Sequence, residues 1–333
     1  MRKTTLAGWM STVLRGAASM VLGLLLILGF WLVGYAGAQA TPTQPAGAGT
    51  QPVVNAQPAR ANSLDDPNFA PEGVELIHDV VIGTGGGQVL HAEIARPKVL
   101  PKDPMPVLLQ IHGGGWSGGS HKTTMTYKVF AQHGYFGASI EYRLASKDAR
   151  WPAQIEDCKL AVRWIRANAE KYHINPNAIG VLGGSAGGHL VACLGVLDDP
   201  ALEGSGGYPG VSSKVQAVVD VNGPTNLVPK DKSRVLPLFA GSAEAMPDAY
   251  RQSSPILHIH PNAPPFFIIH GDKDEMVPVE QSTSFAEALK NAGVPVEILI
   301  VKGASHGLDI LVPGIEDKIL DFCDKHLKGV AAK

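Results

Sequence analysis

The sequence predicts an α/β protein built on a mostly parallel, doubly wound sheet. From Val74 onward, short apolar runs of strand length alternate with segments of helical pattern. Strands of a parallel sheet are apolar on both faces because helices cover the sheet from either side. The 38 glycines and 25 prolines suit the many tight connections that such a fold needs.

Eight strands and five helices are expected along the chain. The first two strands, Val74–Ile82 and Val89–Ile94, should pair at the start of the sheet, and the second alternates as a half-exposed strand does. The other strands are almost wholly apolar, and we expect them at Pro106–Ile111, Gly137–Ile140, Ile179–Leu182, Val215–Val221, Phe266–Ile269 and Val296–Val301. Helices are expected at about Thr124–Gln132, Ala153–Lys171, Ala186–Leu197, Val279–Asn291 and Ile315–Leu327. The Pro-punctuated interval Gly223–Pro265 is expected to form a small lid.

The amino-terminal residues 1–40 have the three parts of an export signal. Basic residues precede an apolar run at about 17–36, and Ala38-Gln39-Ala40 forms a small-residue cleavage site. The run is nearly long enough to span a bilayer, so an uncleaved membrane anchor is the alternative. Residues 41–62 are poor in large apolar side chains and predict a disordered linker, which leaves 63–333 as the folded domain. Both interpretations place that domain outside the cytoplasm.

Composition excludes several classes of protein. Charged residues make up 17% of the chain and the net charge is −2, which argues against nucleic-acid binding. Cys158, Cys193 and Cys323 form neither a CxxC pair nor a cluster with histidine, so we expect no zinc site. Buried free thiols are the expectation, with a Cys158–Cys193 disulfide as the alternative. We expect no metal and no cofactor.

The strongest local motif is Gly183-Gly184-Ser185-Ala186-Gly187. It follows the predicted strand Ile179–Leu182 and opens a predicted helix, which is the context of a G-x-S-x-G nucleophile elbow. Small residues must flank the serine because the turn is tight. An ordinary strand-to-helix loop is the alternative, but the motif and its context favour Ser185 as a nucleophile.

A second glycine motif, His112-Gly113-Gly114-Gly115-Trp116, follows the strand Pro106–Ile111. Glycines allow backbone N–H groups to point at a developing oxyanion, and each such donor contributes about 3 kcal/mol to acyl transfer. We assign the N–H groups of Gly113, Gly114 and Ala186 to an oxyanion hole. A phosphate-binding turn is the alternative, but it lacks the G-K-[ST] or ribose-binding acid. Trp116 could stack on a substrate ring or pack in the core.

A serine nucleophile needs a histidine base and a carboxylate that orients it, and in this context the chain order is serine, acid, histidine. His306 lies in a Gly-flanked loop after the strand Val296–Val301. The acid is Asp274 or Asp272, both after the strand Phe266–Ile269. We expect packing or hydrogen-bonding roles for the rival histidines, which are His112, His189, His258, His260 and His270.

Several stretches together resemble the hormone-sensitive-lipase-like esterases of the α/β-hydrolase superfamily, and among them the bifunctional feruloyl and acetyl xylan esterases. The resemblance covers nearly all of Val74–Leu327 and rests on His112–Trp116, Tyr142-Arg143-Leu144, Trp151-Pro152-Ala153, Ala161–Asn168, Gly184–Leu190, Pro264-Pro265-Phe266, His270–Asp274, Val277-Pro278, Gln281-Ser282, Ala292-Gly293-Val294, Gly303 and His306-Gly307. It implies the α/β-hydrolase fold and ester hydrolysis. It also implies that the acid is the last residue of G-x-x-D, which is Asp274.

The sequence therefore predicts an exported serine esterase acting on short-chain acyl or aryl esters through an acyl-enzyme. The resemblance implies acetyl or feruloyl groups on a xylan-type polysaccharide as the substrate. A general carboxylesterase and an aryl formamidase are the alternative enzymes, although an export signal argues against the second. A non-catalytic binding module is the alternative from another class. A membrane is a partner only if the amino-terminal segment is not cleaved.

Overall fold

A computed structural model describes residues 66, 68–123, 126–230, 233, 236–308, 310 and 314–332. The predicted signal peptide and linker, residues 1–40 and 41–62, lie outside these described residues. Across the described ranges, no helix combines the length and the apolar character that crossing a membrane requires.

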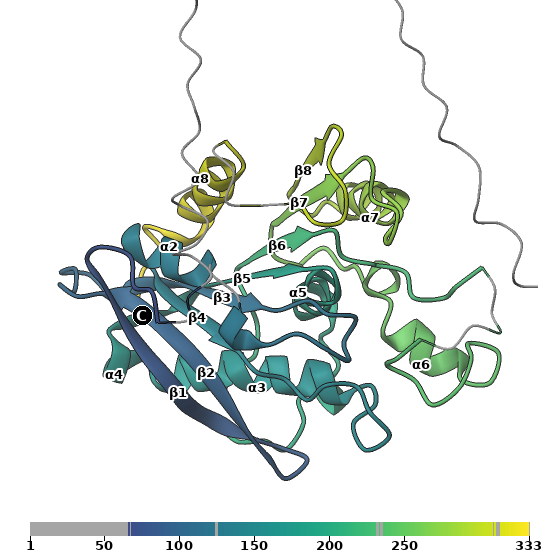
Figure 1. Ribbon diagram of the computed structural model, residues 1–333, viewed down its shortest axis with the longest axis horizontal. Helices are drawn as coiled ribbons and strands as arrows, with labels where there is room; N and C mark the ends of the chain where they lie inside the picture. The colour runs from purple at the N-terminus through teal and green to yellow at the C-terminus, as the bar shows by residue number, and fades with distance from the viewer. Residues whose placement is uncertain are drawn as a thin grey trace, which may run out of the picture. The chain divides into compact units, whose positions relative to one another are not determined.

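A single eight-stranded sheet forms the centre of the domain, with the strand order β1-β2-β4-β3-β5-β6-β7-β8 (Figure 1). β2 runs antiparallel to β1 and β4, and all other neighbouring pairs are parallel. The predicted sheet type is therefore confirmed. The strands are β1 Val74–Gly85, β2 Gln88–Pro97, β3 Met105–Ile111, β4 Phe136–Ile140, β5 Ile174–Gly184, β6 Ala217–Val221, β7 Phe266–Gly271 and β8 Val296–Val301.

Helices cover both faces of the sheet. Buried side chains of α3, α5 and α7 share one apolar cluster with one face, whereas those of α8 and Phe130 of α2 pack on the other (Figure 1). The longer helices are α2 Thr126–Gln132, α3 Ala153–Ala167, α5 Ala186–Val196, α7 Glu280–Asn291 and α8 Ile315–Leu327, and the short ones are α4 Ala169–Tyr172, α6 Pro247–Gln252, η1 His121–Thr123, η2 Pro200–Leu202 and η3 Pro255–Leu257.

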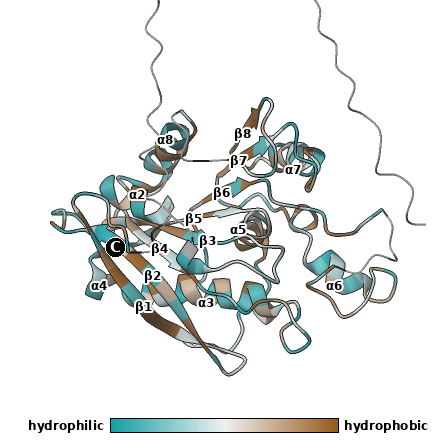
Figure 2. Cartoon of the chain, viewed as in Figure 1, coloured by the Kyte–Doolittle hydropathy of each residue, from teal (hydrophilic) through white to brown (hydrophobic). Residues whose placement is uncertain are grey.

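The apolar runs of the central strands supply both layers of core. In β3, Val107 and Leu109 point into the cluster under α3 and α5, and Leu108 points into the cluster under α8. Figure 2 shows apolar (brown) stretches in the sheet and a mixture of hydrophilic (teal) and apolar residues along α3 and α8. The apolar pattern of Val296–Val301 predicted a strand covered on both faces, and this prediction was wrong. β8 is an edge strand, with Ile298 42% exposed and Ile300 38% exposed.

The helix expected at Ala153–Lys171 is interrupted. Asn168 ends α3, and its side-chain N–H donates to the Trp164 carbonyl over 2.8 Å. Asparagine side chains compete for backbone groups in this way and favour helix ends over helix interiors. The short helix α4 follows and ends at His173 in the left-handed conformation. All three cysteines are free and buried, as predicted.

The interval Gly223–Pro265 packs onto the same domain where the structure describes it. Phe239 and Tyr250 of this interval are buried, with ring centroids 3.9 Å apart. The backbone N–H of Trp151, just before α3, donates to the Leu238 carbonyl. The interval is thus attached beside the amino-terminal end of α3, and its action as a lid stays a prediction.

The strand order reverses at β3. The chain passes from β3 to β4 on one side and then returns to β5 on the other. Open α/β sheets bind ligands outside the carboxyl ends of the strands at such a switch point. The carboxyl ends of β3 and β5 carry the two glycine motifs found in the sequence, so the fold brings these motifs together.

Candidate active site

Ser185 occupies a strained turn between β5 and α5. Its backbone angles are φ 56° and ψ −119°, a region that residues with a Cβ rarely adopt. The flanking glycines are sterically required: a Cβ at Gly183 would lie 2.4 Å from the Gly187 carbonyl oxygen, and one at Gly187 would lie 2.2 Å from the Ile111 carbonyl oxygen. The turn leaves the Ser185 side chain partly exposed at the start of α5.

The structure brings Ser185, His306 and Asp274 into one hydrogen-bonded chain. His306 Nε2 lies 2.9 Å from Ser185 Oγ, and His306 Nδ1 lies 2.7 Å from Asp274 Oδ2. The carboxylate is fully buried and the imidazole is 17% exposed. A buried carboxylate at Nδ1 fixes the tautomer in which Nε2 can accept the serine proton.

The two candidate acids have different environments. Asp274 Oδ1 accepts hydrogen bonds from the N–H groups of Met276 and Val277, each over 2.8 Å. Burial alone raises the pKa of Asp274, but these N–H groups and His306 outweigh burial, so its pKa lies below the usual value. Asp272 instead accepts the Gly303 N–H and is partly exposed. Of these two carboxylates, Asp274 is the one that is hydrogen-bonded to His306.

Two residues that the sequence analysis did not assign to the site hold this arrangement in place. Asn222 adopts φ 53°, donates from Nδ2 to the His306 carbonyl and accepts the Gly271 N–H. The sequence signal that could have identified Asn222 is its position directly after an apolar strand, since asparagine tolerates the left-handed region. The fully buried His270 lies with Nε2 3.2 Å from Asp274 Oδ2 and with Nδ1 2.7 Å from Ser282 Oγ.

Two of the predicted oxyanion donors adjoin Ser185: Ala186 follows it in the chain and Gly113 packs against its turn. A Cβ at Gly113 would lie 2.8 Å from the Gly184 carbonyl oxygen and 3.4 Å from Ser185 Cβ, so the two glycine motifs are in close contact. Gly114 has φ 109°, a conformation that favours glycine. Within the described residues, the N–H groups of Gly113, Gly114 and Ala186 donate to no backbone acceptor. Their role as oxyanion donors stays a prediction.

Trp116 packs in the core. It is 7% exposed, and its indole N–H donates to Nδ1 of the buried His189 over 3.1 Å. The ring is also edge-on to His189, so it is not free to stack on a substrate ring and the packing alternative describes it. His112 stacks on Tyr142 and contacts the Gly113 carbonyl, and it therefore supports the loop, as expected.

A buried carboxyl group, Asp220, lies beneath the elbow. Its Oδ1 accepts the Gly223 N–H over 2.9 Å, and a Cβ at Gly188 would lie 2.4 Å from the same oxygen. Oδ2 is buried and has no hydrogen-bond partner among the described residues. Burial raises the pKa of Asp220 to about 7, against the lowering effect of the Gly223 hydrogen bond.

The assembled groups suit acyl transfer. They supply a hydroxyl that can be activated, a base in contact with it, a carboxylate that orients the base, and a glycine loop packed against the hydroxyl's own turn.

Comparisons with known proteins point to the same chemistry. The BD-FAE family matches residues 93–289. Esterase LipC of Mycobacterium tuberculosis is 36% identical over 246 residues, which is 70% of this chain and 60% of LipC. The matched region thus spans less than two thirds of the length of that curated relative.

Two solved structures are similar over more of their length. A truncated form of a carbohydrate esterase from gut microbiota has a TM-score of 0.69 and 29% identity, over 77% of this chain and 98% of its own. Butyrate-bound esterase Est2 of the planctomycete Thermogutta terrifontis has a TM-score of 0.64 and 29% identity, over 76% of this chain and 93% of its own.

Asp220 predicts a specific dependence of stability on pH. The folded chain retains a proton that the unfolded chain loses, so the free energy of unfolding should fall as pH rises from about 4 to about 7. The difference in pKa from 3.8 to about 7 corresponds to on the order of 4 kcal/mol. Asp220→Asn imitates the neutral acid, so the free energy of unfolding of this variant should fall much less over the same pH range. Urea unfolding of both proteins at pH 5 and pH 8 measures it, and an unchanged pH dependence in the variant would contradict the assignment.

Proposed function

The chain belongs to the BD-FAE family, and on this basis we propose that it is a serine esterase that works through an acyl-enzyme. The family and the α/β-hydrolase fold expected from the sequence are both confirmed. The contact that carries the proposal is the chain of hydrogen bonds from Ser185 Oγ through His306 to Asp274, with distances of 2.9 and 2.7 Å.

The proposed reaction has two halves. Ser185 Oγ attacks the ester carbonyl carbon while His306 Nε2 takes the hydroxyl proton. The N–H groups of Gly113, Gly114 and Ala186 stabilise the oxyanion, and the alcohol leaves with the proton from His306. Water then attacks the acyl-serine with His306 as the base, which releases the acid and restores Ser185. Asp274 orients His306 in both halves.

The finer part of the proposal concerns the substrate, for which we propose acetyl or feruloyl esters of a xylan-type polysaccharide. Two observations support it: a similar structure is named a carbohydrate esterase, and the Thermogutta enzyme was solved with the short acid butyrate. A general carboxylesterase is the second candidate, because the curated relative LipC is named simply an esterase. Because Trp116 is buried, an aryl group would have to be recognised by other side chains.

We further propose that the enzyme acts outside the cytoplasm. The support is the order of basic residues, apolar run and Ala38-Gln39-Ala40 in the sequence. A polysaccharide is met outside the cell, so an exported domain of residues 63–333 after a linker suits the proposed substrate. An uncleaved anchor would give the same location.

The acid can be tested by a matched pair of variants. Asp274→Asn should lower kcat by about 10⁴-fold, because an amide at Nδ1 favours the wrong imidazole tautomer. Asp272→Asn should lower kcat far less, since the Asp272 carboxylate accepts the Gly303 N–H and is not hydrogen-bonded to His306. Initial rates on a nitrophenyl acetate with both purified variants make the comparison. Equal losses, or a larger loss for Asp272→Asn, would overturn the choice of acid.

The substrate class can be tested with a panel of esters. Acetate and ferulate release from acetylated and feruloylated xylan should be detected, and nitrophenyl ester rates should fall as the acyl chain lengthens. Each misplaced methylene is worth about 1–3 kcal/mol in an acyl pocket, so the decline accumulates. N-Formylkynurenine tests the formamidase alternative in the same panel. A preference for long chains with no product from xylan would reject the polysaccharide proposal and leave the esterase proposal intact.

A further inference from the structure

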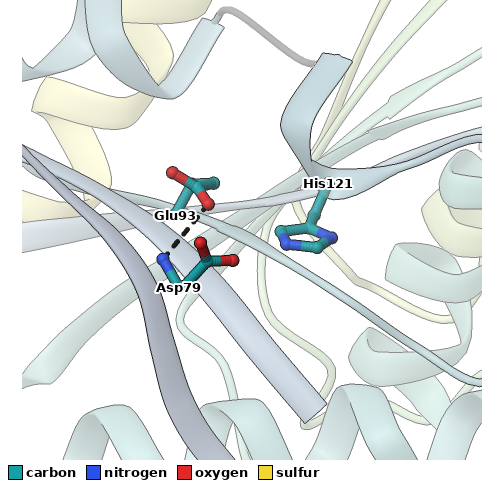
Figure 3. Close-up of side chains that lie close together, drawn as sticks. All are labelled: Asp79, Glu93 and His121. Carbon is teal, nitrogen blue, oxygen red and sulfur yellow. Dashed lines mark hydrogen bonds between the residues drawn. The ribbon is translucent and has the colours of Figure 1, made fainter. Parts of the chain in front are cut away.

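Three side chains that can bind a metal converge at the β1–β2 side of the sheet. Figure 3 shows Asp79 on β1, Glu93 on β2 and His121 on η1 facing one another. Each offers one ligand atom, and these three atoms all lie within 4.8 Å of one another. The proposed function does not use this group.

The backbone of β1 is irregular at this point. The β1–β2 register shifts between Ile77 and Val80, and Asp79 adopts φ 53°. The Asp79 N–H donates to Glu93 Oε1 over 3.2 Å, which holds the two carboxylates close together. A bulge of this kind redirects a side chain, here a carboxylate beside a second carboxylate.

The cluster carries more negative charge than its lysine neutralises. Lys122 Nζ lies 2.6 Å from Asp79 Oδ1 but 4.0 Å from Glu93 Oε1. Glu93 is only 3% exposed, and a buried carboxylate without a full counter-charge is costly. Its second oxygen contacts His78, and the nearby Glu141, which contacts His91, adds a further negative charge. The position therefore favours a cation.

A neighbouring histidine also holds Glu93 in position from outside the cluster. His78 on Glu93 resembles the outer hydrogen bonds that orient metal-binding carboxylates.

We propose that Asp79, Glu93 and His121 form a binding site for a divalent transition-metal ion, with Zn²⁺ as the ion to test. One imidazole nitrogen with two carboxylate oxygens is a zinc-type donor set, whereas Ca²⁺ and Mg²⁺ prefer oxygen donors throughout. A water would complete four-fold coordination.

Binding requires only side-chain adjustment. Bonds of about 2.0–2.2 Å place tetrahedral ligand atoms roughly 3.4 Å apart, so the group must contract slightly. The side chains of Asp79 and Lys122 are 62% and 46% exposed, so Asp79 can rotate inward and the Lys122 ammonium can move into solvent. The ion would then replace Lys122 as the counter-charge.

The ion would fix one end of the loop that carries the predicted oxyanion donors. That loop follows β3 from His112 and runs into η1, where His121 lies. The proposal departs from the expectation that the chain has no metal site. The sequence offered no signal because the three ligands lie on separate elements, at positions 79, 93 and 121.

Calorimetric titration of Zn²⁺ into the untagged, chelator-treated full chain tests the site, with thermal unfolding as a second readout. The wild type should bind one ion at this cluster, and its Tm should rise by roughly 5 °C at about 100 times the Kd. Asp79→Asn and His121→Gln should each weaken this binding at least about tenfold.

Lys122→Met separates a metal site from a simple ion-pair cluster. It removes the competing ammonium, so zinc should bind more tightly than to the wild type. Lys325→Met is the matched control, because it removes an exposed lysine from its pair with Glu297 elsewhere and should leave zinc binding unchanged.

Absence of zinc binding by the wild type overturns the proposal. So does unchanged binding in His121→Gln, or binding in Lys122→Met no tighter than in the wild type. The Lys122→Met result decides the matter if a ligand variant fails to fold.

Discussion

The close contact between the backbones at the carboxyl ends of β3 and β5 is the constraint on which the rest of the site depends. The first turn of α5 approaches the last residue of β3 so closely that a side chain at Gly187 would overlap the Ile111 carbonyl. The same contact brings Gly113 against the residues of the elbow. The proposed nucleophile and the proposed oxyanion donors are thus positioned by main chain, which moves less than side chains do and keeps dipoles oriented before substrate arrives.

The other two catalytic candidates reach Ser185 from strands farther along the sheet. Asp274 follows β7 and His306 follows β8, while Asn222 after β6 binds the backbone of both segments. The hydrogen bonds therefore tie four neighbouring strand ends together. β8 is an exposed edge strand, so the His306 loop depends on these polar contacts more than on burial in the core. We regard Asn222 and His270 as positioning residues for this reason.

Much of the fold and the central site could be predicted because the relevant signals are local. Apolar runs and the alternating segment Val89–Ile94 predicted the strands, and the glycine motifs predicted Ser185 and the loop after β3. Exposure of β8 and the break at Asn168 could not be predicted so well, since a strand's place in the sheet and a helix end depend on tertiary neighbours. Trp116 was ambiguous because only its partner, His189 on another element, decides between packing and substrate contact. The burial of Asp220 and the cluster at Asp79 could not be predicted from the sequence, because both depend on groups far apart in the chain.

The central claim, that His306 activates Ser185 for attack, is tested most directly by covalent labelling with paraoxon. Mass spectrometry of the digested protein should find one diethylphosphoryl group per chain on Ser185, and none in Ser185→Ala. His306→Gln should slow labelling by about 10³-fold or more while leaving the thermal unfolding temperature close to that of the wild type. A label on another residue, or a labelling rate that does not depend on His306, would contradict the account.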